Sequence, residues 1–211
     1  MKRSQLTNMK SQINFSIADV ISIGALFLAW LSCIYILNYK PYYAIFTMLG
    51  ALTLDVTDGY LARKLKKSST IGCELDSYVD VFTYLVFSAL FFHSFLSPHV
   101  ISSLIVGFLI LTFGGLRLIR FNKEGILQLN DKKYYRGVTV VHIAIFTIIS
   151  YFAAEITGRQ IVPILSSIIL ILLSLAMLSD YKSYKLSLPL LVILIVILAF
   201  AGIYLYLQNG Y

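Results

Sequence analysis

The sequence has few charged residues. They make up only 13% of its 211 residues, about half of the ~25% that is usual in soluble domains. The mean hydropathy is +0.84, and a chain of this length cannot bury so much apolar surface in a water-soluble core. The lack of charge therefore excludes a soluble globular domain and predicts an integral membrane protein.

Cysteine and proline are also scarce. The two cysteines, Cys33 and Cys73, form no pattern typical of a disulfide framework, and we expect both to be packing residues. The four prolines lie between apolar runs or in their first turns, where they do not interrupt a helix. The short alternating segments of a transmembrane β-barrel are lacking, so the membrane spans are predicted to be helices.

What the sequence does contain is a series of seven apolar runs. Each has about the 20 residues that a helix needs to cross ~30 Å of hydrocarbon. They lie at roughly 17–38, 41–63, 75–96, 99–121, 137–155, 160–179 and 186–208. The first run is too long for a signal peptide and has no small-residue cleavage site after it, so we interpret it as a retained span. The predicted fold is a single all-α integral membrane domain over residues 1–211.

The basic residues predict the orientation of these spans. If the N-terminus is cytoplasmic, fifteen of the seventeen Lys and Arg residues lie on the cytoplasmic side, and only Lys40 and Arg159 lie outside. The net charge of +7 then favours anionic membrane lipids as partners rather than nucleic acid, because the basic residues crowd the ends of the spans. We expect a multi-pass protein of the cell membrane with a cytoplasmic N-terminus.

Four of the ten acidic residues lie at helical spacings within the second and third runs: Asp55, Asp58, Asp76 and Asp80. The first pair is spaced i, i+3 and the second i, i+4, so each pair lies on one helical face. The two runs form an antiparallel hairpin, which brings all four carboxylates to one depth at the cytoplasmic surface. Their mutual repulsion in a low dielectric would be relieved by divalent cations.

The type of ligand predicts the type of metal. All candidate ligands are carboxylate oxygens, which favours Mg²⁺ or Mn²⁺, with Ca²⁺ as a further occupant, over zinc. Four carboxylates suffice for two ions, and a two-metal site suits in-line displacement at phosphorus.

Small and basic residues stand between the acids. Gly59 and Ala62 leave room beside Asp58, Gly72 permits close approach of a helix, and Arg63 can bind phosphate oxygens bidentately. The alternative is a solvated surface on which the acids pair with neighbouring Lys and Arg residues. That alternative does not explain four acids in register, since acids at membrane depth usually have a function.

A second polar cluster follows the fourth run and contains Arg117, Arg120 and Asn122. The two arginines lie on one helical face and could bind a phosphate or a carboxylate. They could equally anchor the cytoplasmic end of the span and complement its C-terminal dipole. The residue types leave both interpretations open.

The acidic motif resembles the signature of the CDP-alcohol phosphotransferase family. All eight fixed positions are present at the family's spacing: Asp55, Asp58, Gly59, Ala62, Arg63, Gly72, Asp76 and Asp80. The resemblance implies a core of six transmembrane helices over roughly 17–179, with one additional C-terminal transmembrane helix over roughly 186–208. It also implies a homodimer.

The resemblance further implies a reaction and the roles of its residues. A CDP-linked lipid would donate its phosphatidyl group to an alcohol, and CMP would leave. The four aspartates would hold two divalent cations, and Asp80 would also be the general base that takes the proton of the acceptor hydroxyl. The CDP site would be lined by Asp58, Gly59, Ala62, Arg63 and Gly72.

A further resemblance concerns the acceptor. The stretch from Arg117 to Asn122 is similar to the Arg-x-x-Arg-Phe-Asn stretch of bacterial and archaeal phosphatidylserine synthases, and residues 175–185 resemble another of their conserved stretches. This implies CDP-diacylglycerol as donor and serine as acceptor, with Arg117 or Arg120 on the serine carboxylate and Asn122 helping to orient it. Gly137 lacks the Leu-Pro that usually follows it in those enzymes, which keeps glycerol 3-phosphate and an inositol phosphate open as alternative acceptors.

Functions of another class are also open. A cation transporter would carry acids near mid-membrane with access from both sides, whereas here they cluster at one interface beside basic residues. A non-catalytic membrane scaffold would carry the acids as a surface patch. The complete motif favours the phosphatidyltransferase over both.

Overall fold

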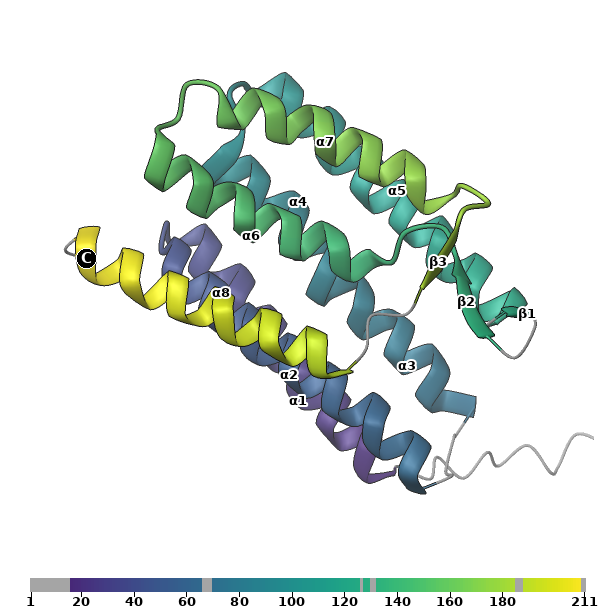
Figure 1. Ribbon diagram of the computed structural model, residues 1–211. Helices are drawn as coiled ribbons and strands as arrows, with labels where there is room; N and C mark the ends of the chain where they lie inside the picture. Colours follow the sequence, from purple (N-terminus) through teal and green to yellow (C-terminus); the bar gives the residue numbers. More distant parts are fainter. Residues whose placement is uncertain (1–15, 66–69, 126, 130–131, 185–187, 210–211) are drawn as a thin grey trace, which may run out of the picture.

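The computed structural model describes residues 16–65, 70–125, 127–129, 132–184 and 188–209, with the backbone alone at 62–65, 70–73, 127–129, 132–133 and 184. Most of these residues are helical (Figure 1). The helical elements are α1 (Ile17–Leu37), α2 (Pro41–Leu65), α3 (Thr70–Asp80), η1 (Val81–Val86), α4 (Phe87–Phe91), η2 (Phe92–Leu96), α5 (Val100–Glu124), α6 (Val140–Thr157), α7 (Val162–Met177) and α8 (Leu188–Asn209).

Each predicted apolar run corresponds to helix. The third run is one continuous rod, α3–η1–α4–η2, in which η1 and η2 are turns of π-helix. It begins at Thr70, earlier than the predicted residue 75, and α6 begins at Val140, later than the predicted residue 137. The sequence pattern misplaced the first start because α3 continues into residues that include the polar Thr70 and Glu74, and the second because Gly137 and Val138 are uncharged but precede the helix.

Within the described part of the chain, five helical stretches are long and apolar enough to cross a membrane: 17–37, 74–96, 100–124, 140–157 and 188–209. The apolar helix α7 is shorter, with 16 residues, and α2 carries two acids in its second half. Both pack alongside the five, α2 against α1 and α7 against α5 and α6. The expected all-α, multi-pass membrane architecture is confirmed.

The helices begin and end where local chemistry allows. Ser16 and Asp19 form a capping box at the start of α1, with Ser16 Oγ 3.2 Å from the Asp19 amide and Asp19 Oδ2 2.7 Å from the Ser16 amide. Pro41 is the first residue of α2, where its missing amide hydrogen is not needed. Gly125 and Gly158, both with positive φ, end α5 and α6.

The rod α3–η1–α4–η2 forms the centre of the bundle. Its segments contact α1, α2, α5 and α6, and Tyr84, Phe87, Phe91 and Phe92 on it are fully buried. The last helix, α8, packs on α2 and α6 and is drawn in yellow in Figure 1. The rod therefore carries side chains into contact with most of the other helices.

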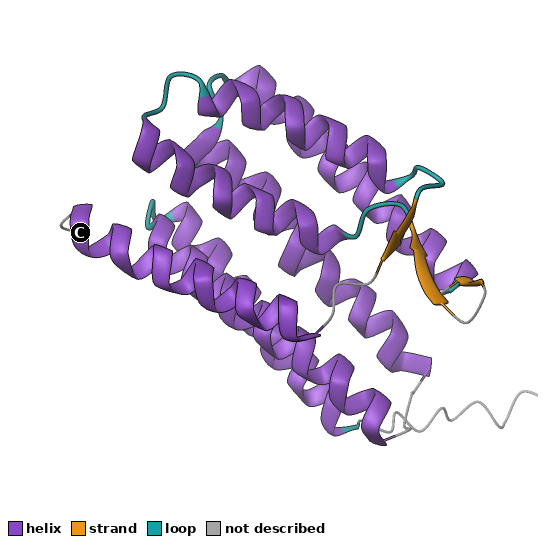
Figure 2. Ribbon diagram, viewed as in Figure 1, coloured by secondary structure: helices purple, strands orange, loops and turns teal. Residues whose placement is uncertain are grey.

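The structure adds a small sheet to the helical bundle (Figure 2). Its strands β1 (Leu127–Leu129), β2 (Lys132–Arg136) and β3 (Lys182–Tyr184) are antiparallel in the order β1-β2-β3. Strand β2 pairs with β3, which lies far away in the sequence. The sheet ties the α5–α6 connection to the α7–α8 connection.

The sheet marks one end of the bundle, on the right in Figure 1, where α2, α5 and α7 end and α1, α3, α6 and α8 begin. We call this the sheet end. The opposite end contains the connections after α1, η2 and α6.

Candidate active site

Three carboxylates meet near the sheet end of the bundle. Asp55 lies on α2, and Asp76 and Asp80 lie on α3. One oxygen atom of each lies within 4.8 Å of an oxygen atom of the other two. Asp55 and Asp80 are half-buried, whereas Asp76 is exposed. The α2–α3 hairpin thus brings together acids separated by more than twenty residues in the sequence.

A tyrosine completes this group. Tyr84 is fully buried on η1, and its hydroxyl donates a hydrogen bond to Oδ2 of Asp55. Tyr84 follows Asp80 by four residues, and the π-helix begins directly after Asp80. Residues at i, i+4 share one face of a helix, so Tyr84 lies on the same face as Asp80.

The fourth acid of the motif has different surroundings. Asp58 is only 3% exposed, and its Oδ2 accepts a hydrogen bond from the hydroxyl of Ser22 on α1. It is not part of the close group formed by Asp55, Asp76 and Asp80. Its role as a fourth metal ligand stays a prediction.

The close group suits a hard cation. It offers carboxylate oxygens only, which are the ligands that Mg²⁺, Mn²⁺ and Ca²⁺ prefer. Three carboxylates within 4.8 Å of one another, two of them half-buried, repel strongly unless a positive charge compensates them. The residues present therefore fit the divalent metal that the motif implies.

A buried arginine on α5 supplies positive charge beside the acids. Arg117 is only 5% exposed, and its charge interacts with that of Asp80. Its guanidinium lies 5.4 Å from the centre of the Phe121 ring. Its Nε has no hydrogen-bond partner among the described residues. A buried guanidinium with an unused donor beside the acids can receive an anionic group.

The other two residues of this cluster are engaged elsewhere. Arg120 donates to four backbone carbonyls, those of Arg136, Met177, Leu178 and Ser179. Asn122 is exposed, and its Nδ2 lies 2.8 Å from Oγ of Ser77 on α3. In this structure the charge of Arg117 interacts with that of Asp80, whereas Arg120 binds backbone carbonyls. The predicted acceptor contacts of all three residues stay predictions.

The residues predicted to bind CDP lie near the end of α2 and the start of α3. Gly59 follows Asp58 on α2 and is half-buried. Ala62 and Arg63 lie in the last turns of α2, and Gly72 lies at the start of α3, where only the backbone is described. Their predicted contacts with CDP therefore fall outside the described side chains.

Sequence reasoning missed two residues of the site. Tyr84 had a signal, since it continues the i, i+4 series of Asp76 and Asp80. Ser22 had none, because the register of α1 against α2 cannot be read from either helix alone.

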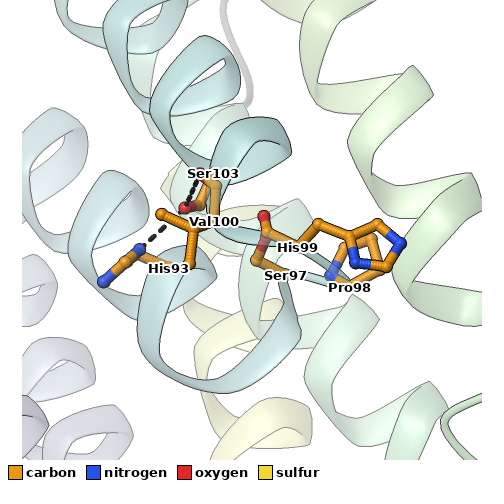
Figure 3. A pocket seen from close by; sticks show the side chains of 6 residues that line it. All are labelled: His93, Ser97, Pro98, His99, Val100 and Ser103. Carbon is orange, nitrogen blue, oxygen red and sulfur yellow. Dashed lines mark hydrogen bonds between the residues drawn. The ribbon is translucent and has the colours of Figure 1, made fainter.

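The recess in Figure 3 lies at the opposite end of the bundle. It has a volume of about 350 Å³ and is lined by His93, Ser97, Pro98, His99, Val100 and Ser103. Nδ1 of His93 lies 2.7 Å from Oγ of Ser103, so the imidazole of His93 has a hydrogen-bond partner within the recess. His93 is thirteen residues beyond Asp80, about 20 Å along a helix. The recess is therefore separate from the acids.

A comparison with known families decides the family of the chain. A sequence model described as CDP-alcohol phosphatidyltransferase matches residues 15–208. The chain belongs to the CDP-alcohol phosphatidyltransferase family. The match runs from the start of α1 to the end of α8, so it includes the last span as well as the acidic motif.

Two curated proteins similar to this chain come from Helicobacter pylori strains 26695 and J99. Each is named CDP-diacylglycerol–serine O-phosphatidyltransferase and is 26% identical over 132 residues. The matched part is 62% of this chain and 55% of each relative. The chain thus spans about half the length of the curated relatives it matches.

Proposed function

We propose that this protein transfers the phosphatidyl group of CDP-diacylglycerol to the hydroxyl of serine, giving phosphatidylserine and CMP. The observation that carries the proposal is the group of Asp55, Asp76 and Asp80 beside the buried charge of Arg117. Such a site offers both signs of charge, as a diphosphate substrate and a zwitterionic acceptor require.

In the proposed reaction Asp80 is the general base. It takes the proton of the acceptor hydroxyl, whose oxygen forms a bond to the phosphorus of the phosphatidyl group. The bond from that phosphorus to the bridging oxygen of the diphosphate breaks, and CMP leaves with this oxygen. Two divalent cations, Mg²⁺ or Mn²⁺, held by Asp55, Asp58, Asp76 and Asp80, would stabilise negative charge on the diphosphate.

Binding is assigned to residues on either side of the acids. Gly59, Ala62, Arg63 and Gly72, with Asp58, would line the site of the CDP group. Arg117 would bind the serine carboxylate, because its Nε has no partner among the described residues and charge-assisted hydrogen bonds to carboxylates are strong. The similarity to relatives named for serine supports this acceptor.

We also propose the setting of the reaction. The distribution of Lys and Arg favours a cell-membrane protein whose N-terminus and active site face the cytoplasm. The donor lipid then reaches the site from the membrane and serine from the cytoplasm. Anionic membrane lipids beside the basic sheet end and a second copy of the chain are the further partners we propose.

The test is an acceptor panel. The purified protein in nanodiscs is given CDP-diacylglycerol and either Mg²⁺ or Mn²⁺, with serine, glycerol 3-phosphate or inositol phosphate. CMP release and the lipid product are measured by mass spectrometry. We expect phosphatidylserine, formed only with serine and abolished by EDTA. Products from glycerol 3-phosphate or inositol phosphate instead would keep the reaction class and replace the acceptor.

Asp80→Asn tests the assigned base. We expect this variant to lose about 10²- to 10⁴-fold in kcat, the usual contribution of a general base. Asp180→Asn is the matched control, because Asp180 is an exposed acid that pairs with Arg136. Full activity of Asp80→Asn would remove Asp80 as base. Absence of CMP release with every acceptor would contradict the transferase, and cation flux in liposomes would then favour a transporter.

A further inference from the structure

Two arginines one turn apart on α5 have different surroundings. Arg117 is buried with an unused donor beside the acids, whereas Arg120 is bonded to backbone carbonyls. We infer that Arg120 is a positioning residue that fixes the sheet end of α5 and, through it, the guanidinium of Arg117, which alone meets the anionic group of the acceptor. The part of this inference that concerns the acceptor rests on the proposed function.

The contacts of Arg120 join three parts of the chain. Nη1 lies 2.9 Å from the carbonyl oxygen of Leu178, and Nη2 lies 3.0 Å from that of Met177 and 3.2 Å from that of Arg136. The oxygen of Ser179 lies 3.3 Å from the same Nη2. Met177 is the last residue of α7, so Arg120 satisfies carbonyls that a helix end leaves without intrahelical partners.

The charge of Arg120 suits this place for a second reason. A helix C-terminus carries partial negative charge, which a cation stabilises. Guanidinium also has several donors in a fixed plane and no acceptor, so one side chain can serve carbonyls of two segments. If an acceptor molecule accepted hydrogen bonds from Arg120, the carbonyls at the end of α7 would lose theirs.

A glycine allows the segments to meet. Gly137 has a φ of +73°, and a Cβ at this position would lie 2.1 Å from the oxygen of Met177 and 3.1 Å from Nη2 of Arg120. The Gly137 amide donates to the oxygen of Tyr181 at 2.7 Å, and the hydroxyl of Ser183 donates to the oxygen of Gly137 at 2.6 Å. We call Arg120, Gly137, Ser183 and the carbonyls of residues 177–179 the clasp.

The clasp connects to Arg117 through two aromatic rings. The guanidinium of Arg117 lies over the ring of Phe121, whose centre lies 5.6 Å from that of Tyr135. Tyr135 on β2 pairs with Ser183 on β3, and Ser183 is part of the clasp. Opening the clasp therefore frees the surface on which the guanidinium of Arg117 rests.

Hydrogen–deuterium exchange of the substrate-free protein tests the clasp directly. We expect Arg120→Ala to speed exchange of the amides of Gly137 and Val138, which donate to Tyr181 and Ala176, by about tenfold or more, given the strength of charged hydrogen bonds. Arg117→Ala should leave these amides unchanged. Because no substrate is present, this result stands whatever acceptor the enzyme uses.

Kinetics with the active acceptor tests the link to Arg117. We expect Arg117→Ala to raise the KM for that acceptor by about 10-fold or more, with little change in the KM for CDP-diacylglycerol. Arg120→Ala should raise the same KM, but add little in the Arg117→Ala background, because residues that act through one contact are not additive.

Two outcomes would overturn the inference. The first is that Arg120→Ala leaves amide exchange of Gly137 and Val138 unchanged, and that its effect on the acceptor KM multiplies with that of Arg117→Ala in the double variant. Arg120 would then bind the acceptor directly. If Arg120→Ala does not fold, Arg120→Lys replaces it, since lysine keeps the charge but lacks the planar fork. Exchange and KM of Arg120→Lys equal to those of the unmodified protein would also contradict the clasp.

Discussion

Two hydroxyl groups that lie outside the acidic motif hold the carboxylates of α2. Ser22 of α1 donates to Asp58, and Tyr84 of η1 donates to Asp55. Both donors are almost completely buried, so water does not compete with them. Groups that orient the ligands of a metal raise its affinity by limiting how the ligands can turn. At the scale of single residues, the site therefore extends beyond the acids themselves.

Tyr84→Phe tests this role of a hydroxyl. We expect it to weaken Mn²⁺ binding about 10- to 100-fold, the usual effect of removing a group that orients a ligand. The phenyl ring is retained, so packing in the rod changes little. Mn²⁺ affinity is measured by electron paramagnetic resonance without CDP-lipid, which separates binding from activity.

Tyr204→Phe is the control for this measurement. Tyr204 lies on α8 and is exposed, so loss of its hydroxyl should leave Mn²⁺ affinity unchanged. Equal affinity in the Tyr84 and Tyr204 variants would show that the bond to Asp55 does not orient a metal ligand.

At the scale of elements, a close approach between α5 and η1 fixes the two helices that carry Arg117 and Tyr84. A Cβ at Gly114 would lie 2.3 Å from Cδ2 and 3.0 Å from Cγ of Leu85, which is fully buried. At the next residue, Gly115, a Cβ would meet nothing within 4 Å. These neighbouring glycines therefore differ in environment although they are alike in sequence.

Alanine substitutions of Gly114 and Gly115 test this difference in environment. We expect Gly114→Ala to lower the free energy of unfolding, because overpacking costs about 1–3 kcal/mol and outweighs the ~1 kcal/mol that alanine gains in a helix. Gly115→Ala should leave stability unchanged or raise it. Thermal unfolding in detergent measures both, and equal midpoints for the two variants would contradict the close packing of α5 on η1.

At the scale of the whole molecule, the last span is docked onto the bundle. Nδ2 of Asn209 lies 2.8 Å from the Tyr42 hydroxyl and 3.0 Å from Oε2 of Glu155, which also pairs with Arg159. These polar groups lie at the opposite end from the acids. The last span α8 thus makes specific polar contacts with α2 and α6.

Residues at the two ends of the bundle should differ in their accessibility to a reagent outside the cell. In a Cys33→Ser and Cys73→Ser background, His99→Cys should react with a membrane-impermeant maleimide in intact cells. Asp180→Cys should react only after permeabilisation, because the basic residues predict that the sheet end is cytoplasmic. Both original side chains are exposed, and the cysteine-free protein is the control. The reverse pattern would invert the proposed orientation.

The sequence by itself determined the helices and the helical faces on which the acids lie. Apolar runs of about 20 residues must be helical in a bilayer, because every backbone polar group needs an internal partner there. Acids at i, i+3 and i, i+4 share a helical face for the same local reason. The motif from Asp55 to Asp80 could therefore be assigned to a hairpin, and its family expectation was confirmed.

Only the tertiary structure decided which polar groups meet across helices. From the sequence, either arginine of α5 could have bound the acceptor. In the structure the charge of Arg117 interacts with that of Asp80, whereas Arg120 donates hydrogen bonds to carbonyls at the end of α7. The pairing of β2 with β3 and the bond from Ser22 to Asp58 were also out of reach. Periodicity reports the face of a single helix, but these contacts depend on the register between segments far apart. The partners of Arg120 are backbone carbonyls, which every residue has, so no residue type in the sequence marks them as its partners.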